Sequence, residues 1–171
     1  MKPLPALSAA LALCLAAACA QMPQTAEEFR KAVPGAMMAK TDRYEVNRPL
    51  REVAATFRRK APECLNMTVR TVSRTSTSYQ NILTQYTATV IVSGERAELH
   101  VQQEHKTGVI YPSKPPAGGP YILVADALAQ PGGRTVVQFY GPSRGYDVLY
   151  RAIQGWASGA NLGCPDLTKI G

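Results

Sequence analysis

Histidine, serine and aspartate are the side chains of this chain that could act in acid–base or nucleophilic catalysis. The only histidines, His100 and His105, are five residues apart in one expected strand, so they face opposite sides and cannot share a metal without an intervening bulge. His100 shares its face with Glu98 and Gln102, which favours an ordinary exposed histidine over a catalytic base. We assign no serine to the strand–Gly-x-Ser-x-Gly–helix setting that presents a nucleophile in hydrolases. The sequence therefore predicts no enzyme activity, and a hydrolase built from distant Ser, His and Asp side chains is the alternative.

Asp126 is a carboxylate in another expected strand, where it lies amid the apolar residues Leu123, Val124, Ala125 and Leu128. A carboxylate in such a position could have a shifted pKa and a functional role. The alternatives are that Asp126 faces solvent on one side of the sheet or that it pairs with an arginine.

Cys64 and Cys164 are the two cysteines that lie outside the N-terminal segment. In an oxidising compartment an even pair of cysteines favours a disulfide. Closing a loop of ~100 residues would contribute about 4–5 kcal/mol in the chain-entropy model. The alternatives are two buried free thiols or a metal site, but no further Cys or His stands at ligand spacing. We therefore predict a Cys64–Cys164 disulfide, no metal site and no cofactor.

The segment Gly141–Asp147, Gly-Pro-Ser-Arg-Gly-Tyr-Asp, is the most distinctive stretch of the chain. It is expected to lead into a C-terminal helix, where free backbone N–H groups and Arg144 could hold an anion. The alternative is a simple helix cap formed by Ser143 or Asp147. Tyr146 and Trp156 could line a pocket between this helix and the sheet, although core packing explains them as well. Arg144, Tyr146 and Trp156 are therefore the candidate ligand or anion contacts.

The N-terminal segment has the organisation of a secretory signal. Lys2 supplies a positive charge, and Leu4–Ala20 is almost wholly apolar or small. This run is too short for a comfortable membrane span of ~20 residues but suits an exported leader. Ala18-Cys19-Ala20 has small residues at the positions a general signal peptidase requires, which would release a chain beginning at Gln21.

The stretch Leu15-Ala16-Ala17-Ala18-Cys19 resembles the bacterial lipobox, although Ala16 stands where leucine is usual. The resemblance implies a diacylglyceryl group on the Cys19 thiol, cleavage after Ala18 and firm attachment to a membrane. Ala20 replaces the aspartate that signals inner-membrane retention, which favours the periplasmic face of the outer membrane. The alternative is a soluble periplasmic or secreted protein.

The exported part is basic. Removing the leader takes the formal net charge from +7 to +6 and leaves about 150 residues, a size typical of one compact domain. A basic face could contact anionic envelope polymers or lipid head groups, and a merely solvated surface is the alternative. An exported chain without an aromatic–basic motif is not expected to bind nucleic acid. Basic residues, mostly arginines, are concentrated in one third of the chain: Arg43, Arg48, Arg51, Arg58, Arg59, Lys60, Arg70 and Arg74.

Two helices are expected in the first third of the chain. A capping-box pattern at Thr25–Glu28 predicts a short helix from Ala26 to about Val33. Asn47 and Pro49 predict the start of a second helix with one apolar stripe. Pro62 is expected to end that helix, which leaves Cys64 in extended chain. The apolar stripe consists of Leu50, Val53, Ala54 and Phe57.

Strands are expected over 41–46 and, about five times, between 65 and 141, followed by an amphipathic helix over about 144–160. This order predicts an α+β fold: an antiparallel sheet of about five to six strands packed on an N-terminal helix and a C-terminal amphipathic helix. The expected domains are 1–18 signal peptide, 19–40 lipid-anchor linker with a short helix, and 41–171 a single α+β domain.

This order of elements, over residues 41–164, resembles the helix-grip architecture, in which a curved antiparallel sheet wraps a C-terminal helix. Small lipoproteins of the outer-membrane assembly machinery and START-like lipid carriers share that layout, but a shared layout alone gives no function. The first hypothesis is a non-catalytic, outer-membrane-anchored lipoprotein that binds envelope proteins or anionic polymers. The alternative is a carrier of an apolar or amphiphilic ligand, housed between the sheet and the C-terminal helix beside Leu149, Ile153 and Trp156.

Overall fold

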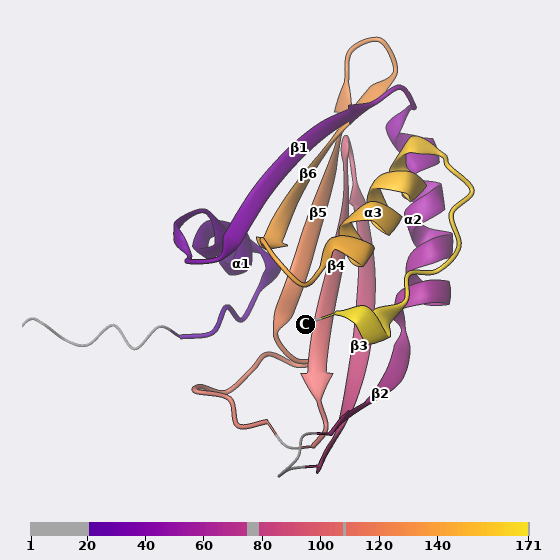
Figure 1. The fold of residues 1–171 in the computed structure, drawn as a ribbon. Helices are drawn as coiled ribbons and strands as arrows, with labels where there is room; N and C mark the ends of the chain where they lie inside the picture. The colour runs from indigo at the N-terminus through magenta and orange to yellow at the C-terminus, as the bar shows by residue number, and fades with distance from the viewer. Residues whose placement is uncertain (1–20, 75–78, 108, 171) are drawn as a thin grey trace, which may run out of the picture.

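The computed structural model of the chain describes residues 21–74, 79–107 and 109–170. At its centre is a six-stranded antiparallel sheet with the strand order β1-β6-β5-β4-β3-β2 (Figure 1). The fold class is α+β, as predicted. The predicted leader, including Cys19, lies outside the described residues. The strands are β1 (Ala39–Val46), β2 (Met67–Arg74), β3 (Tyr79–Ser93), β4 (Arg96–His105), β5 (Tyr121–Gln130) and β6 (Arg134–Pro142).

The two faces of the sheet differ in chemistry because alternate side chains point in opposite directions. On β4, Leu99 and Val101 are fully buried in the apolar core. Glu98 precedes Leu99, and His100 lies between Leu99 and Val101. Both therefore point to the other face. Glu98 pairs in register with Asp126 of β5, so the polar residues of neighbouring strands gather on that second face.

Helix α2 (Leu50–Leu65) lies across β3, β4, β5 and β6 on the apolar face of the sheet. Three residues of its predicted stripe, Val53, Ala54 and Phe57, are buried, and Leu50 is half-buried. The prediction that Pro62 ends this helix is wrong, since the helix continues to Leu65. A proline inside a helix costs about 3 kcal/mol, but the full burial of Cys64 and Leu65 stabilises this last turn.

Helix α3 (Asp147–Ser158) packs beside α2 and is shorter than the predicted range. Gly159 ends it at φ 87°, a conformation that favours glycine. The Arg48 guanidinium closes this end of the helix, because its Nη1 donates to the carbonyl oxygens of Trp156 at 3.1 Å and Ala157 at 3.0 Å. A positive charge at a helix C-terminus also interacts favourably with the helix dipole.

Helix α1 (Ala26–Ala32) and the short 3-10 helix η1 (Val33–Gly35) lie on the opposite face of the sheet from α2 and α3 (Figure 1). The predicted cap is present, as the Thr25 hydroxyl accepts from the Glu28 N–H at 3.1 Å. This segment was expected to belong to a linker. It packs on β5 instead, so α1 is an element of the folded domain.

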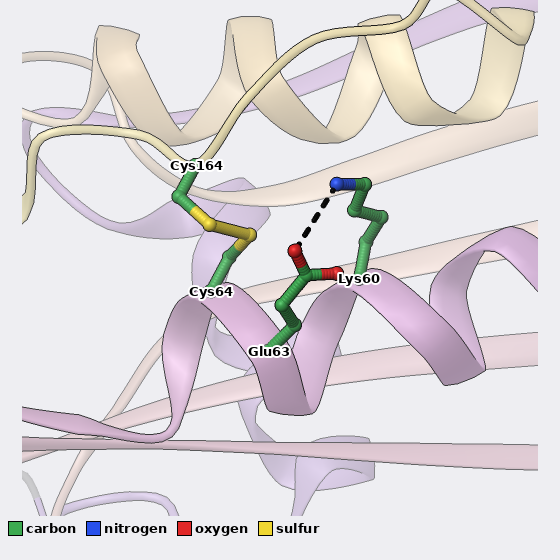
Figure 2. The surroundings of a disulfide bond; sticks show 4 residues. All are labelled: Lys60, Glu63, Cys64 and Cys164. Atoms are coloured by element: carbon green, nitrogen blue, oxygen red, sulfur yellow. Dashed lines mark hydrogen bonds and ion pairs between the residues drawn. A yellow bond between two sulfur atoms is a disulfide. The ribbon is translucent and has the colours of Figure 1, made fainter.

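The predicted disulfide joins Cys64 at the end of α2 to Cys164 in the C-terminal segment (Figure 2). The two cysteines are 100 residues apart in the chain, and their Cα atoms are 5.0 Å apart. The bridge holds the segment after α3, including the short helix η2 (Leu167–Lys169), against the last turn of α2.

Most of the predicted basic face is exposed. Arg51, Arg58 and Arg59 project from α2 into solvent. None of the helices within the described ranges combines the length and the apolar character needed to cross a bilayer.

Candidate functional site

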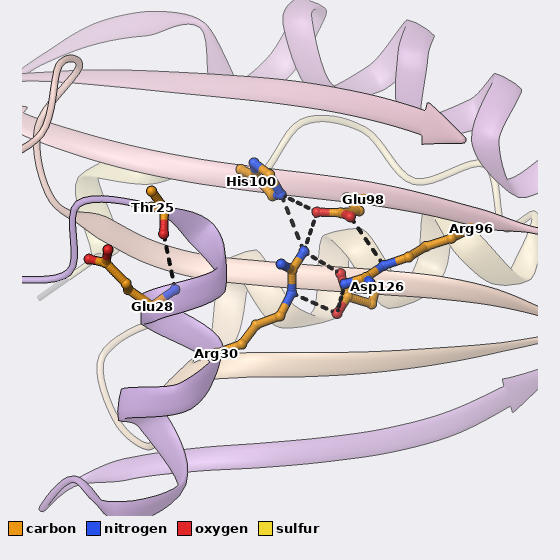
Figure 3. Close-up of polar contacts among 7 residues, drawn as sticks. All are labelled: Thr25, Glu28, Arg30, Arg96, Glu98, His100 and Asp126. Carbon is orange, nitrogen blue, oxygen red and sulfur yellow. Dashed lines mark hydrogen bonds and ion pairs between the residues drawn. The ribbon is translucent and has the colours of Figure 1, made fainter. Parts of the chain in front are cut away.

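An ion cluster joins α1 to the polar face of the sheet (Figure 3). The Arg30 guanidinium donates to both Asp126 oxygens, from Nε and from Nη2, each at 2.8 Å. Arg30 also pairs with Glu98. Arg96 of β4 donates from Nη2 to Asp126 at 2.8 Å, and its Nε lies 3.1 Å from a Glu98 oxygen. Two arginines thus face two carboxylates from different elements.

The cluster contains two arginines and two acidic residues, and its Arg30–Asp126 pair is largely removed from water, whereas Arg96 is 39% exposed. The Asp126 side chain is only 5% exposed and that of Arg30 14%. Burial alone would raise the pKa of Glu98, but hydrogen bonds from His100 and Arg30, together with the charges of Arg30 and Arg96, hold that pKa below its ordinary value. The cluster therefore keeps the Glu98 carboxylate ionised and acts as a clamp between α1 and the sheet.

His100 belongs to this cluster, and the prediction that it is an exposed histidine is wrong. It is 8% exposed, and its Nε2 lies 2.7 Å from a Glu98 oxygen. The alternating pattern of β4 predicted its face correctly. The Arg30 guanidinium of α1 approaches the ring at 3.4 Å, and the Tyr121 ring lies edge-on to it with centroids 6.0 Å apart. Asp126 pairs with arginine, which was one of the alternatives drawn from the sequence.

His105 lies apart from the cluster, near the end of β4. Its Nδ1 is 3.0 Å from the Thr84 hydroxyl, and burial lowers its pKa. In the described part of the chain, the one group of three potential metal ligands within 4.8 Å of each other is Glu63, Cys64 and Cys164. Its two sulfurs are bonded to each other, so only the Glu63 carboxylate would be left to bind a metal.

A groove of about 520 Å³ opens between α1–η1 and the chain that joins β6 to α3. Its lining is mostly apolar and contains no carboxylate. Pro23, next to the first described residues, also lies along it. Ligand pockets in proteins have this kind of volume and this largely apolar lining with few polar groups. One wall is made by Phe29, Val33, Met37 and Met38, and the other by Pro142, Arg144 and Tyr146.

The groove wall that contains Met37 and Met38 has an unusual backbone conformation. Met38 has φ 56°, a value in the left-handed region that non-glycine residues seldom adopt. Its carbonyl oxygen accepts from the Ser143 N–H at 2.7 Å, which fixes the turn to the opposite wall. Met37 and Met38 are 91% and 67% exposed. Backbone strain of this kind is enriched at binding sites, so this turn makes the groove a candidate site.

The structure brings together two of the three predicted contact residues. Arg144 and Tyr146 line the groove, whereas Trp156 is fully buried in the core. Leu149 and Ile153, expected beside a cavity under the C-terminal helix, are likewise 0% exposed. The groove lies elsewhere, between α1–η1 and the loop before α3. Sequence reasoning did not find its other wall, because that wall comes from a segment expected to be a linker.

The segment Gly141-Pro-Ser-Arg-Gly145 does match the Gly-x-Ser-x-Gly pattern between a strand and a helix, which the sequence reasoning passed over. A serine nucleophile needs a base within hydrogen-bond reach. In the described residues, the hydrogen bonds of His100 run to Glu98 and Arg30, and those of His105 to Thr84 and Gln103. Neither imidazole is hydrogen-bonded to Ser143, so in this structure no histidine base is in place beside its hydroxyl.

No known family model matches this chain, and a search of curated proteins returned no match.

Proposed function

We propose that this chain is a non-catalytic lipoprotein of the bacterial envelope, anchored through Cys19 to the periplasmic face of the outer membrane. In this role the folded domain is a binding or assembly module. Its binding site is the groove between α1–η1 and the loop before α3. The basic residues of α2 would add contacts to anionic envelope polymers.

The observation that carries the proposal is the position of the groove next to the N-terminal end of the domain. Pro23 lines the groove and stands four residues after Cys19. Four residues of extended chain span at most about 14 Å. A lipid on Cys19 would therefore hold the groove close to the membrane surface.

The N-terminal segment is also tied to the domain, which supports a short and defined attachment. The Met22 N–H donates to the Ser113 hydroxyl at 3.1 Å, and the Gln24 side-chain amide donates to the Lys114 carbonyl at 3.0 Å. Together with the Arg30 clamp, these contacts would leave little free chain between the anchor and the fold.

We propose further that the packing is of the helix-grip type. Its support is the placement of α2 and α3 together on one face of an antiparallel sheet, with the Tyr150 ring edge-on to Phe139 at 5.2 Å. One feature differs from that layout, because α2 covers more of the sheet than α3 does.

Membrane fractionation tests the anchor. We expect the wild-type protein to float with outer membranes and to resist extraction at alkaline pH. Cys19→Ala should release it into the periplasm, whereas Cys14→Ala, which removes the other cysteine of the same apolar run, should leave it on the membrane. A wild-type protein that is soluble, or a Cys19→Ala variant that stays on the membrane, would overturn the proposal.

A further inference from the structure

We propose that the groove binds a long-chain fatty acid, with the alkyl chain along the apolar walls and the carboxylate on the Arg144 guanidinium. This inference rests on the proposed function, because it names the ligand class of that same binding site. It places a single-chain anionic amphiphile beside the membrane to which the protein is attached.

The apolar walls suit an alkyl chain. Phe29 and Val33 form the inner surface, and Met37 and Met38 extend it outward. Methionine side chains are flexible and polarisable, so they can adapt to a chain of variable conformation. Exposure of two adjacent methionines to water is unfavourable and is relieved when an alkyl chain covers them.

The charge of the groove suits a carboxylate. Arg144 is exposed and is the one charged residue of the lining. No ion pair between described residues involves it, in contrast to Arg30 and Arg96 in the nearby cluster. A guanidinium can donate two parallel hydrogen bonds to the two oxygens of a carboxylate. The lining has no acidic residue to repel such a head group.

The walls of the groove are held in place before a ligand arrives. The Tyr150 hydroxyl donates to the Pro142 carbonyl at 3.1 Å. Glycine at position 141 leaves room for this hydroxyl, because a Cβ atom on residue 141 would lie 2.5 Å from the Tyr150 hydroxyl oxygen. The Arg30 clamp fixes α1, and the Met38–Ser143 hydrogen bond ties the walls together. Such preorganisation lowers the entropic cost of binding.

The test uses the full chain with Cys19→Ala, so that no lipid on the protein itself can occupy the groove. The probe is 11-(dansylamino)undecanoic acid, a fluorescent fatty acid, displaced by palmitic acid or by the neutral hexadecanol. We expect saturable binding of the probe, and palmitic acid should displace it at least ten-fold better than hexadecanol. Arg144→Glu should weaken binding of the probe at least ten-fold and abolish the preference for palmitic acid. Met37→Asp should weaken both competitors.

Two matched variants serve as controls. Arg151→Glu reverses an exposed arginine of α3 outside the groove, and Met67→Asp changes an exposed methionine of β2. Both should bind the probe as the parent does. The inference is overturned if the parent does not bind the probe, if Arg144→Glu and Met37→Asp bind normally, or if the controls lose binding equally. Because the assay uses an unlipidated chain, its failure leaves the Cys19 anchor standing, and failure of the anchor leaves the assay unaffected.

Discussion

Arg30 and Asp126 are 96 residues apart in the chain, yet two nitrogens of the guanidinium bind the two carboxylate oxygens at 2.8 Å each. This ion pair joins the short helix α1 to the centre of the sheet. It turns a segment that follows the predicted anchor into one wall of the groove. The stability of α1 therefore decides whether the proposed binding site exists.

Removing the Arg30 guanidinium should release α1. Breaking a buried ion pair by removing one partner costs about 3–5 kcal/mol, and the remaining Arg96 would reduce that cost. We expect Arg30→Met to lower the free energy of unfolding by about 2–3 kcal/mol and to speed hydrogen exchange of the α1 amides. Lys31→Met removes the neighbouring surface pair with Glu27, which water screens, and should leave the free energy of unfolding nearly unchanged. Equal effects of the two variants would contradict the clamp.

Acid should weaken the same clamp through Glu98. Because its pKa in the folded protein lies below its ordinary value of 4.5, the unfolded chain takes up this proton first as the pH falls. The stabilisation is complete above the unfolded pKa and is lost as the pH falls through the folded pKa. We expect the free energy of unfolding to drop more steeply below about pH 4.5 in the wild type than in Glu98→Gln. Urea unfolding at several pH values measures this, and parallel curves would exclude the role of Glu98.

The disulfide should account for a large part of the global stability. The bridge closes a loop between cysteines 100 residues apart, and the chain-entropy model assigns such a loop about 4–5 kcal/mol of stabilisation. We expect the double variant Cys64→Ala/Cys164→Ala to lose several kcal/mol in guanidinium unfolding, and reductant to destabilise the wild type but not the variant. If reductant leaves the wild-type unfolding midpoint unchanged, the bridge does not stabilise the fold.

Arg48 should stabilise the end of α3. Its guanidinium supplies the hydrogen bonds that the last carbonyls of the helix lack, and each such bond from a charged donor contributes about 1.5–3 kcal/mol. We expect Arg48→Met, which removes both bonds, to cost about 3 kcal/mol in the free energy of unfolding, the low end of that range. Arg51→Met, on the exposed side of α2, should change it by less than about 0.5 kcal/mol. Thermal unfolding by circular dichroism compares the two.

The features that sequence reasoning predicted correctly come from local patterns. The alternation on β4 placed Leu99 and Glu98 on opposite faces, and the apolar stripe of α2 identified Phe57 as a core residue. The disulfide followed from the number of cysteines beyond the leader. Each of these depends on spacing within one element or on the count of one residue type.

The features that sequence reasoning missed depend on contacts between distant elements. Nothing local to Arg30 indicates that it reaches Asp126, and nothing local to His100 indicates that Arg30 approaches its ring. The isolated carboxylate at Asp126 was the available signal, because a buried charge needs a partner. The groove depends in addition on the positive φ of Met38, which no residue type at that position predicts.

The central claim is that a lipid on Cys19 holds this domain and its groove at a membrane. The most direct measurement is the mass of the N-terminal peptide of the protein purified from bacterial membranes. The account predicts a peptide that begins at Cys19 and carries a diacylglyceryl group, together with a Cys64–Cys164 disulfide elsewhere in the same sample. A mature chain that begins at Gln21 without any acyl group would contradict it.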